Sequence, residues 1–90
     1  MTTVTNVADF NVAIAKGVDS ITISGDIATN SKFDLNGKSI VNLTIDLADM
    51  ANGDALTLTN GSVTNLTVID KAGVLLTIEN VLVQSSTSLN

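Results

Sequence analysis

Residues 42–69 read NLTIDLADMANGDALTLTNGSVTNLTVI, and the opening NLTI returns almost unchanged as NLTV 23 residues later. Apolar and small polar residues alternate three times within this stretch, at Leu43-Thr44-Ile45, Leu56-Thr57-Leu58 and Leu66-Thr67-Val68. A period of two is typical of a β-strand with one buried face and one wet face. We therefore expect many short strands, separated by turns rich in Asn, Gly and Asp.

The same pattern extends beyond this stretch, with further triplets beginning at Ile21, Phe33 and Leu76. The apolar residues form three interleaved series: Ile21/Leu43/Leu66, spaced by 22 and 23; Phe33/Leu56/Leu76, spaced by 23 and 20; and Ile40/Val63/Val81, spaced by 23 and 18. Three series with one shared period indicate a coil with three faces per winding. The sequence thus predicts an all-β fold, a short right-handed parallel β-solenoid of about three rungs, each rung being one winding.

The predicted corners repeat as well. Asn36-Gly37 returns as Asn60-Gly61 and, without the glycine, as Asn80-Val81, while Asn42 returns as Asn65. Asn tolerates the left-handed backbone conformation that tight corners need, and stacked Asn side chains can bond from rung to rung. The competing interpretation is an antiparallel meander or small β-sandwich with Asn-Gly hairpin turns. That alternative gives no reason for the 22–23-residue recurrence.

The first element is predicted to be a helix over residues 7–15. Thr5 or Asn6 can act as N-cap, and Lys16-Gly17 supplies a C-terminal stop. One apolar stripe follows the helical period and consists of Val7, Phe10, Ala13 and Ile14. We expect this helix to cover one end of the solenoid.

Ninety residues make a single domain, which we divide into an N-terminal strand and capping helix (1–17), the solenoid rungs (18–83) and a polar tail (84–90). The tail offers no evident cap for the last rung, and open strand edges template pairing with another chain. We expect self-association, as a homo-oligomer or by end-to-end stacking, or further rungs of a larger protein. The alternative is that the tail folds back over the last rung.

Composition excludes several classes of partner. The chain has a net charge of −5, four scattered lysines, and no Arg, His or Cys. No basic patch exists for nucleic acid or an anionic membrane surface, and no apolar run is long enough for a membrane span. The N-terminus lacks the features of a signal peptide. We expect synthesis in the cytoplasm and a place in a virion or extracellular assembly.

The sequence offers no catalytic, cofactor-binding or metal-binding residue that we would assign, and we predict a non-enzymatic protein. Ser-His and Cys-His arrangements are excluded because the chain has neither His nor Cys. Four acids, Asp46, Asp49, Asp54 and Asp70, lie beside corners and invite comparison with glycosidic acid pairs or a calcium site. Their spacing matches no calcium motif, and we interpret them as solvated turn residues.

A threonine column is the last candidate. Thr22, Thr44 and Thr67 hold the same place in successive rungs, as they would on an ice-binding solenoid. Two threonines per strand would be expected there, yet the second position holds Ser24, Asp46 or Ile69. Threonine also simply suits the wet face of a strand. A surface glycan remains open as a partner, although aromatic platforms are lacking.

The helix over residues 7–15, the segment Gly17-Val18-Asp19-Ser20-Ile21-Thr22-Ile23-Ser24-Gly25-Asp26-Ile27 and the Asn-cornered rungs together carry a resemblance. They resemble the opening of right-handed parallel β-helix proteins of the pectin-lyase-like superfamily, which includes polysaccharide lyases, bacterial surface proteins and phage tailspikes. The resemblance implies that the helix caps the first rung. It also implies a structural and interaction module, most simply a segment of a phage tail fibre or surface fibre used for virion attachment or adhesion. The alternatives are an N-terminal fragment of a polysaccharide-active β-helix enzyme and an ice-binding solenoid.

Overall fold

A computed structural model describes residues 2–89, of which more than half lie in strands and nine in one helix. The elements follow the order β1 (Thr2–Val4), α1 (Val7–Ala15), β2 (Ser20–Ile23), β3 (Ser31–Asp34), β4 (Ser39–Asp46), β5 (Ala55–Ile69) and β6 (Leu75–Leu89). The predicted mostly-β composition with a single N-terminal helix is confirmed.

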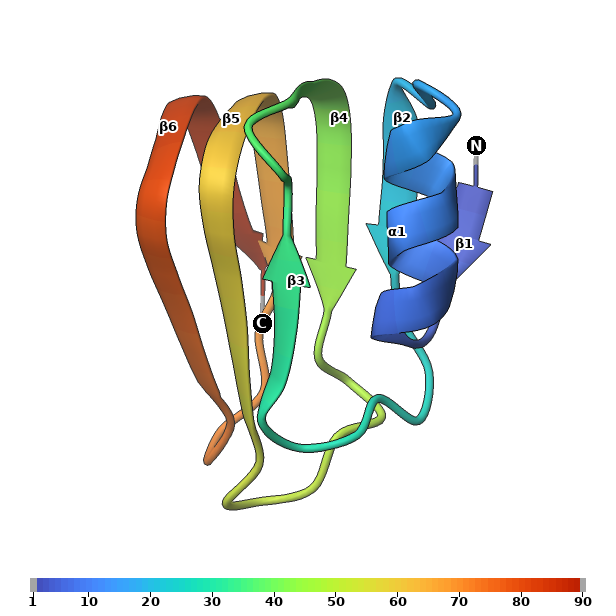
Figure 1. The fold of residues 1–90 in the computed structure, drawn as a ribbon. Coiled ribbons are helices and arrows are strands. Elements are labelled where there is room, and N and C mark those ends of the chain that lie inside the picture. Colours follow the sequence, from blue (N-terminus) through green and yellow to red (C-terminus); the bar gives the residue numbers. More distant parts are fainter. Residues whose placement is uncertain (1, 90) are drawn as a thin grey trace.

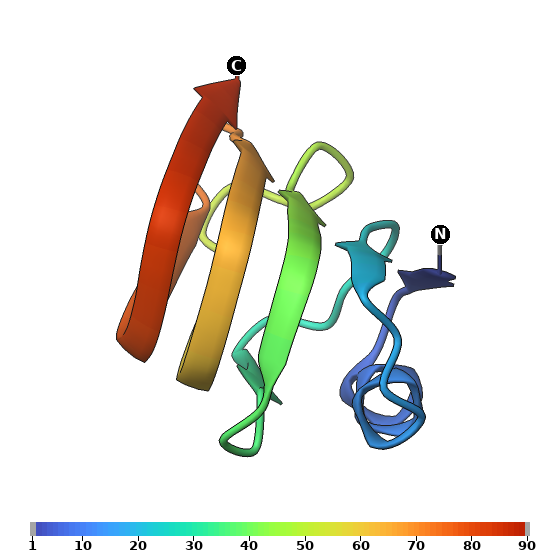
Figure 2. The same cartoon turned by 90° about the horizontal axis from the view of Figure 1, so that it is seen from above.

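The strands form one curled, parallel sheet (Figure 1). One wall consists of β1, β2, β4 and the second halves of β5 and β6, and the other of β3 with the first halves of β5 and β6. The view from above shows how β5 and β6 bend from one wall to the other (Figure 2). Because each of these pairings is parallel, the antiparallel meander or sandwich is wrong for the described residues.

The register of the long wall follows the series that begins at Ile21. Ile21 pairs with Leu43, and Leu43 pairs with Leu66. All three side chains are buried, as are Ile23 and Ile45 beside them. Like residues therefore stack on like residues at the predicted intervals of 22 and 23, and these ladders form the core.

The series that begins at Phe33 is corrected by two residues. Phe33 pairs with Leu58 and not with Leu56, whereas the predicted pairing of Leu56 with Leu76 is confirmed. The cause is a longer corner between β3 and β4. Residues 35–38 form this corner, whereas only residues 60–61 form the equivalent corner within β5. The extra residues include Leu35, which is fully buried.

The third series is corrected at its last member. Ile40 pairs with Val63 as expected, but Val63 pairs with Val83 and not with Val81. The shift to an interval of 20 arises in the loops, because residues 70–74 connect β5 to β6 whereas residues 47–54 connect β4 to β5. Three fewer loop residues shorten the repeat from 23 to 20.

The predicted asparagine corners adopt the left-handed backbone conformation. The φ angles are +55° at Asn36, +66° at Asn60 and +58° at Asn80. At Asn60 and Asn80 the bend takes so few residues that pairing resumes at once, at Gly61 with Val81. Strands β5 and β6 are therefore 15 residues long each and are not divided into the short strands that the triplets predicted.

The helix begins and ends as predicted. The Oδ1 of the N-cap Asn6 accepts the backbone N–H of Asp9 at 2.8 Å. At the other end Gly17, with φ at +76°, donates to Ile14, and Val18 donates to Ala13, which is the hydrogen-bond pattern of a Schellman motif.

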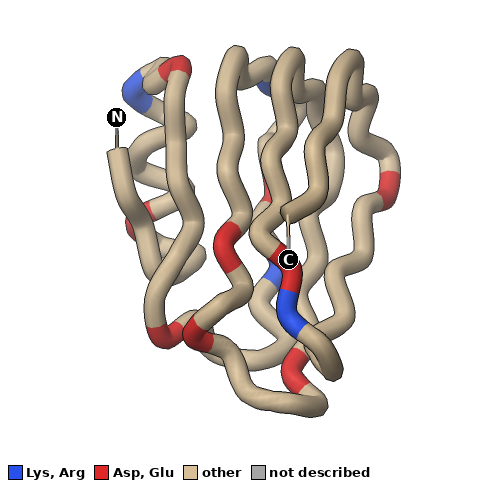
Figure 3. The backbone as a smooth tube through the Cα atoms, turned by 180° about the vertical axis from the view of Figure 1, so that it is seen from behind, with Lys and Arg blue, Asp and Glu red and all other residues tan. Residues whose placement is uncertain are grey.

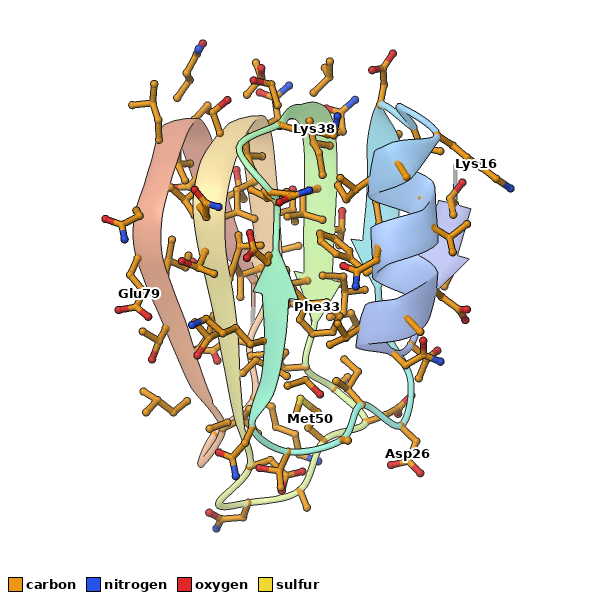
Figure 4. All side chains as sticks on the ribbon, in the orientation of Figure 1. Lys16, Asp26, Phe33, Lys38, Met50 and Glu79 are labelled. Carbon is orange, nitrogen blue, oxygen red and sulfur yellow. The ribbon has the colours of Figure 1, made fainter. Side chains whose placement is uncertain are left out.

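Helix α1 packs against β1 and β3 and covers one end of the core. Phe10 of α1 meets Phe33 of β3 edge to face, with ring centroids 5.2 Å apart. Both rings are buried, and Figure 4 shows Phe33 lying between its strand and the helix. The two aromatic residues of the chain thus fix the helix to the sheet.

The opposite end of the core has no such cover among the described residues. Ladders that are buried in β2 and β4 become exposed in β6, where Ser86 and Ser88 continue the positions of Leu66 and Val68. The predicted polar tail also differs from the structure, since strand β6 continues through it to Leu89. Its serines and threonine pair with β5 because backbone pairing does not require apolar side chains.

Candidate functional site

Strand β6 is the most exposed secondary-structure element and forms an edge of the sheet. It pairs with β5 and, within the described residues, with no further strand. The N–H of Leu75 donates to Asp54 on the β5 side. Alternate N–H and C=O groups therefore point away from β5, so that the edge carries a row of unpaired hydrogen-bonding groups.

Apolar side chains accompany this open backbone. Of the six large apolar residues found exposed among residues 2–89, four belong to β6: Leu75 (64%), Ile78 (39%), Leu82 (65%) and Leu89 (49%). Glu79 is the one charged residue of the strand and points away from the sheet (Figure 4). The backbone view shows that most acidic positions gather at bends and loops (Figure 3). The edge is thus a partly apolar strip with a single charge.

A second feature is a polar array on the outer face of the long wall. The predicted column of Thr22, Thr44 and Thr67 is confirmed in register, and Thr3 and Thr87 extend it to five strands. A parallel column two residues away contains Ser20, Asn42, Asn65 and Ser85. Asn65 Nδ2 donates to Asn42 Oδ1 at 3.1 Å, which confirms the expected bonding between stacked asparagines.

The loop over residues 47–54 binds the side-chain ammonium group of a lysine. The Nζ of Lys71, from the neighbouring loop, donates to the backbone carbonyl oxygens of Ala48 and Met50. These are oxygens of the kind that a calcium ion would use. The ammonium group of Lys71 therefore occupies part of the oxygen-rich site considered for calcium, a role that its isolated position in the sequence did not reveal.

The carboxylates of this region serve their own turns. Asp46 Oδ1 accepts the N–H of Ala48 at 3.0 Å, and Asp70 Oδ1 accepts the N–H of Lys71 at 2.8 Å. Asp54 Oδ2 likewise accepts a backbone N–H within the loop. Asp46, at the end of β4, pairs with Ile69, at the end of β5, and Asp70 follows directly after it. Across residues 2–89, no three acidic side chains converge on a position for a metal ion.

A cleft of about 360 Å³ lies between the C-terminal half of α1 and the corner that follows β3. Its walls are both polar and apolar and comprise Asn11, Ile14, Ala15, Asp34, Asn36 and Lys38. The Oδ1 of Asp34 already accepts the N–H of Asn36 and the Nδ2 of Asn60. The carboxylate of Asp34 in the cleft thus stabilises the corner that follows β3.

No match to this chain is found among family models, curated proteins or solved structures. Within residues 2–89, no helix has both the length and the apolar character to cross a bilayer.

Proposed function

We propose that the chain is a non-enzymatic structural and interaction module: a short right-handed parallel β-solenoid segment of a larger fibre or surface assembly of the phage tail-fibre kind. The observation that carries the proposal is the register. Strands β2, β4 and β5 stack like residues on like residues at intervals of 22 and 23, and β6 continues the parallel pairing at an interval of 20. Right-handed winding is the expected hand, because connections between parallel neighbouring strands are nearly always right-handed.

The distribution of polar groups supports a structural role. The carboxylates of Asp46, Asp54 and Asp70 each accept a backbone N–H in a turn, and Lys71 binds two loop carbonyls. These residues thus have roles in holding loops in shape. A module whose ladders are closed by α1 at one end and left open along β6 at the other suits a segment that continues into an assembly.

A duplication tests the solenoid directly. A second copy of residues 47–69 inserted after Ile69 adds one full interval, because Asp46 pairs with Ile69. Solenoids are quasi-one-dimensional, so the longer chain should fold, unfold at a higher urea concentration and lengthen by about 4.8 Å in solution scattering. Duplication of residues 47–58 is the matched control, since it places the two walls out of register. Equal loss of structure in both duplications would refute the solenoid.

Ice binding is a second candidate function, favoured by the five-strand threonine column and its Ser/Asn neighbour. Strand spacing of about 4.8 Å and a column separation of about 6.6 Å create a regular two-dimensional array of polar groups. Such an array can order water in a lattice. Thermal hysteresis should then vanish in Thr44→Lys and persist in Thr57→Lys, which changes the other wall. Freezing behaviour that Thr44→Lys does not alter would exclude this function.

A further inference from the structure

We infer that two copies of this chain associate tail to tail, with strand β6 of one copy pairing antiparallel with β6 of the other. The inference rests on the proposed function and names its partner. The open edge is long, since β6 has 15 residues and pairs with β5 along the whole of its length. At about 3.3 Å per residue, the edge follows about 50 Å of backbone, in two arms that meet at the bend at Asn80.

The edge carries little of the usual protection against pairing. Natural edge strands are guarded by lysine, proline, bulges or a short length. Strand β6 contains no lysine and no proline, and Leu75 and Leu82 are each about two-thirds exposed. Its charge is limited to Glu79. A partner strand would cover these apolar groups and satisfy the free backbone groups at the same time.

The area of the edge is sufficient for a dimer. A sheet layer with its side chains is about 10 Å thick, so the two arms of the bent edge, about 50 Å of backbone together, present about 500 Å². Two such strips bury about 1,000 Å², the lower limit for a specific interface. Partial pairing over a few residues would fall well below this limit, so the partner must be of similar length.

Only β6 itself meets this requirement within the described part of the chain. Head-to-tail stacking would place β6 against β1, which has three residues, and against the helix α1, which offers no strand edge. Strand β5, the other 15-residue strand, is already paired on both sides. A second copy of β6 is therefore the matching surface. Twofold symmetry makes the two strands antiparallel, because identical edges face each other.

Lysine substitutions on the edge test the inference. Leu75→Lys and Leu82→Lys place charges on the exposed strip without entering the core, and Val12→Lys on α1 is the control, since Val12 is 53% exposed. Sedimentation equilibrium up to millimolar concentration should show a monomer–dimer equilibrium for the original chain. Each β6 variant should weaken dimerisation at least tenfold, and Val12→Lys should leave it unchanged.

Three outcomes would overturn the inference: a monomer at every concentration, a dimer that the β6 lysines do not weaken, or species that grow beyond the dimer as head-to-tail stacking would produce. The duplication experiment separates this failure from failure of the proposed function. A strict monomer that still accepts an inserted 47–69 interval would refute the dimer and leave the solenoid in place.

Discussion

Gly61 allows the corners of β5 and β3 to lie in close contact, and its replacement by alanine should be unusually costly. A Cβ on residue 61 would lie 2.4 Å from the Cβ of Leu35 and 2.6 Å from the carbonyl oxygen of Lys38. Favourable contacts between carbon atoms begin near 3.5 Å, so the overlap is about 1 Å. Neither neighbouring atom can rotate away, because both are fixed to the backbone.

Overpacking costs about 1–3 kcal/mol, and the rigidity of both neighbours places Gly61→Ala at the upper end, near 3 kcal/mol. For a domain of this size that loss corresponds to a fall in melting temperature of about 12–24 °C. Urea denaturation followed by circular dichroism measures the free energy of unfolding.

The matched control is Gly37→Ala at the preceding corner. Gly37 has a φ of +76° with open space around it, whereas Gly61 is not among the residues with positive φ. Alanine at residue 37 should therefore cost only the left-handed strain, about 1 kcal/mol. If Gly61→Ala were as stable as Gly37→Ala, the corners would not be stacked as described and the reasoning would be refuted.

Two further substitutions probe single contacts. Lys71→Met removes the ammonium group from the loop over residues 47–54 and should lower the free energy of unfolding by about 1–2 kcal/mol in urea denaturation, because hydrogen bonds to charged groups are stronger than neutral ones. The control Lys32→Met changes an exposed lysine and should leave this free energy unaltered. Equal losses in the two variants would show that Lys71 does not stabilise the loop. Asn6→Ala deletes the N-cap of α1 and should lower the free energy of unfolding by about 1 kcal/mol. The control Asn11→Ala lies within the helix and should not lower it. A larger loss in Asn11→Ala than in Asn6→Ala would contradict the cap assignment.

Most of the fold could be predicted from the alternation of apolar and polar side chains. The alternation around Leu43 and Leu66 predicted their pairing, because a shift of one residue would turn every buried side chain toward water. The lengths of corners and loops were not predictable in the same way. Leu35 lies in a corner yet fills the core, and the shorter loop before β6 moves Val83 into the place expected for Val81.

The candidate sites were predicted less completely for the same reason. Thr3 and Thr87 join the threonine column through intervals of 19 and 20, which the 22–23-residue repeat does not indicate. Lys71 reaches two carbonyl oxygens whose position depends on the loop conformation and not on any sequence motif. The open last strand, by contrast, was predicted, because the residues after Val83 are polar and could not extend the apolar ladders.

The most direct test of the account is a nuclear Overhauser spectrum of the labelled protein that resolves the methyl groups of Leu43 and Leu66. Stacked parallel strands predict strong methyl cross-peaks between these two residues, together with contacts between Thr44 and Thr67 in the same register. Intense Hα–Hα cross-peaks between neighbouring strands, which antiparallel pairing produces, or the absence of any contact between Leu43 and Leu66, would contradict it.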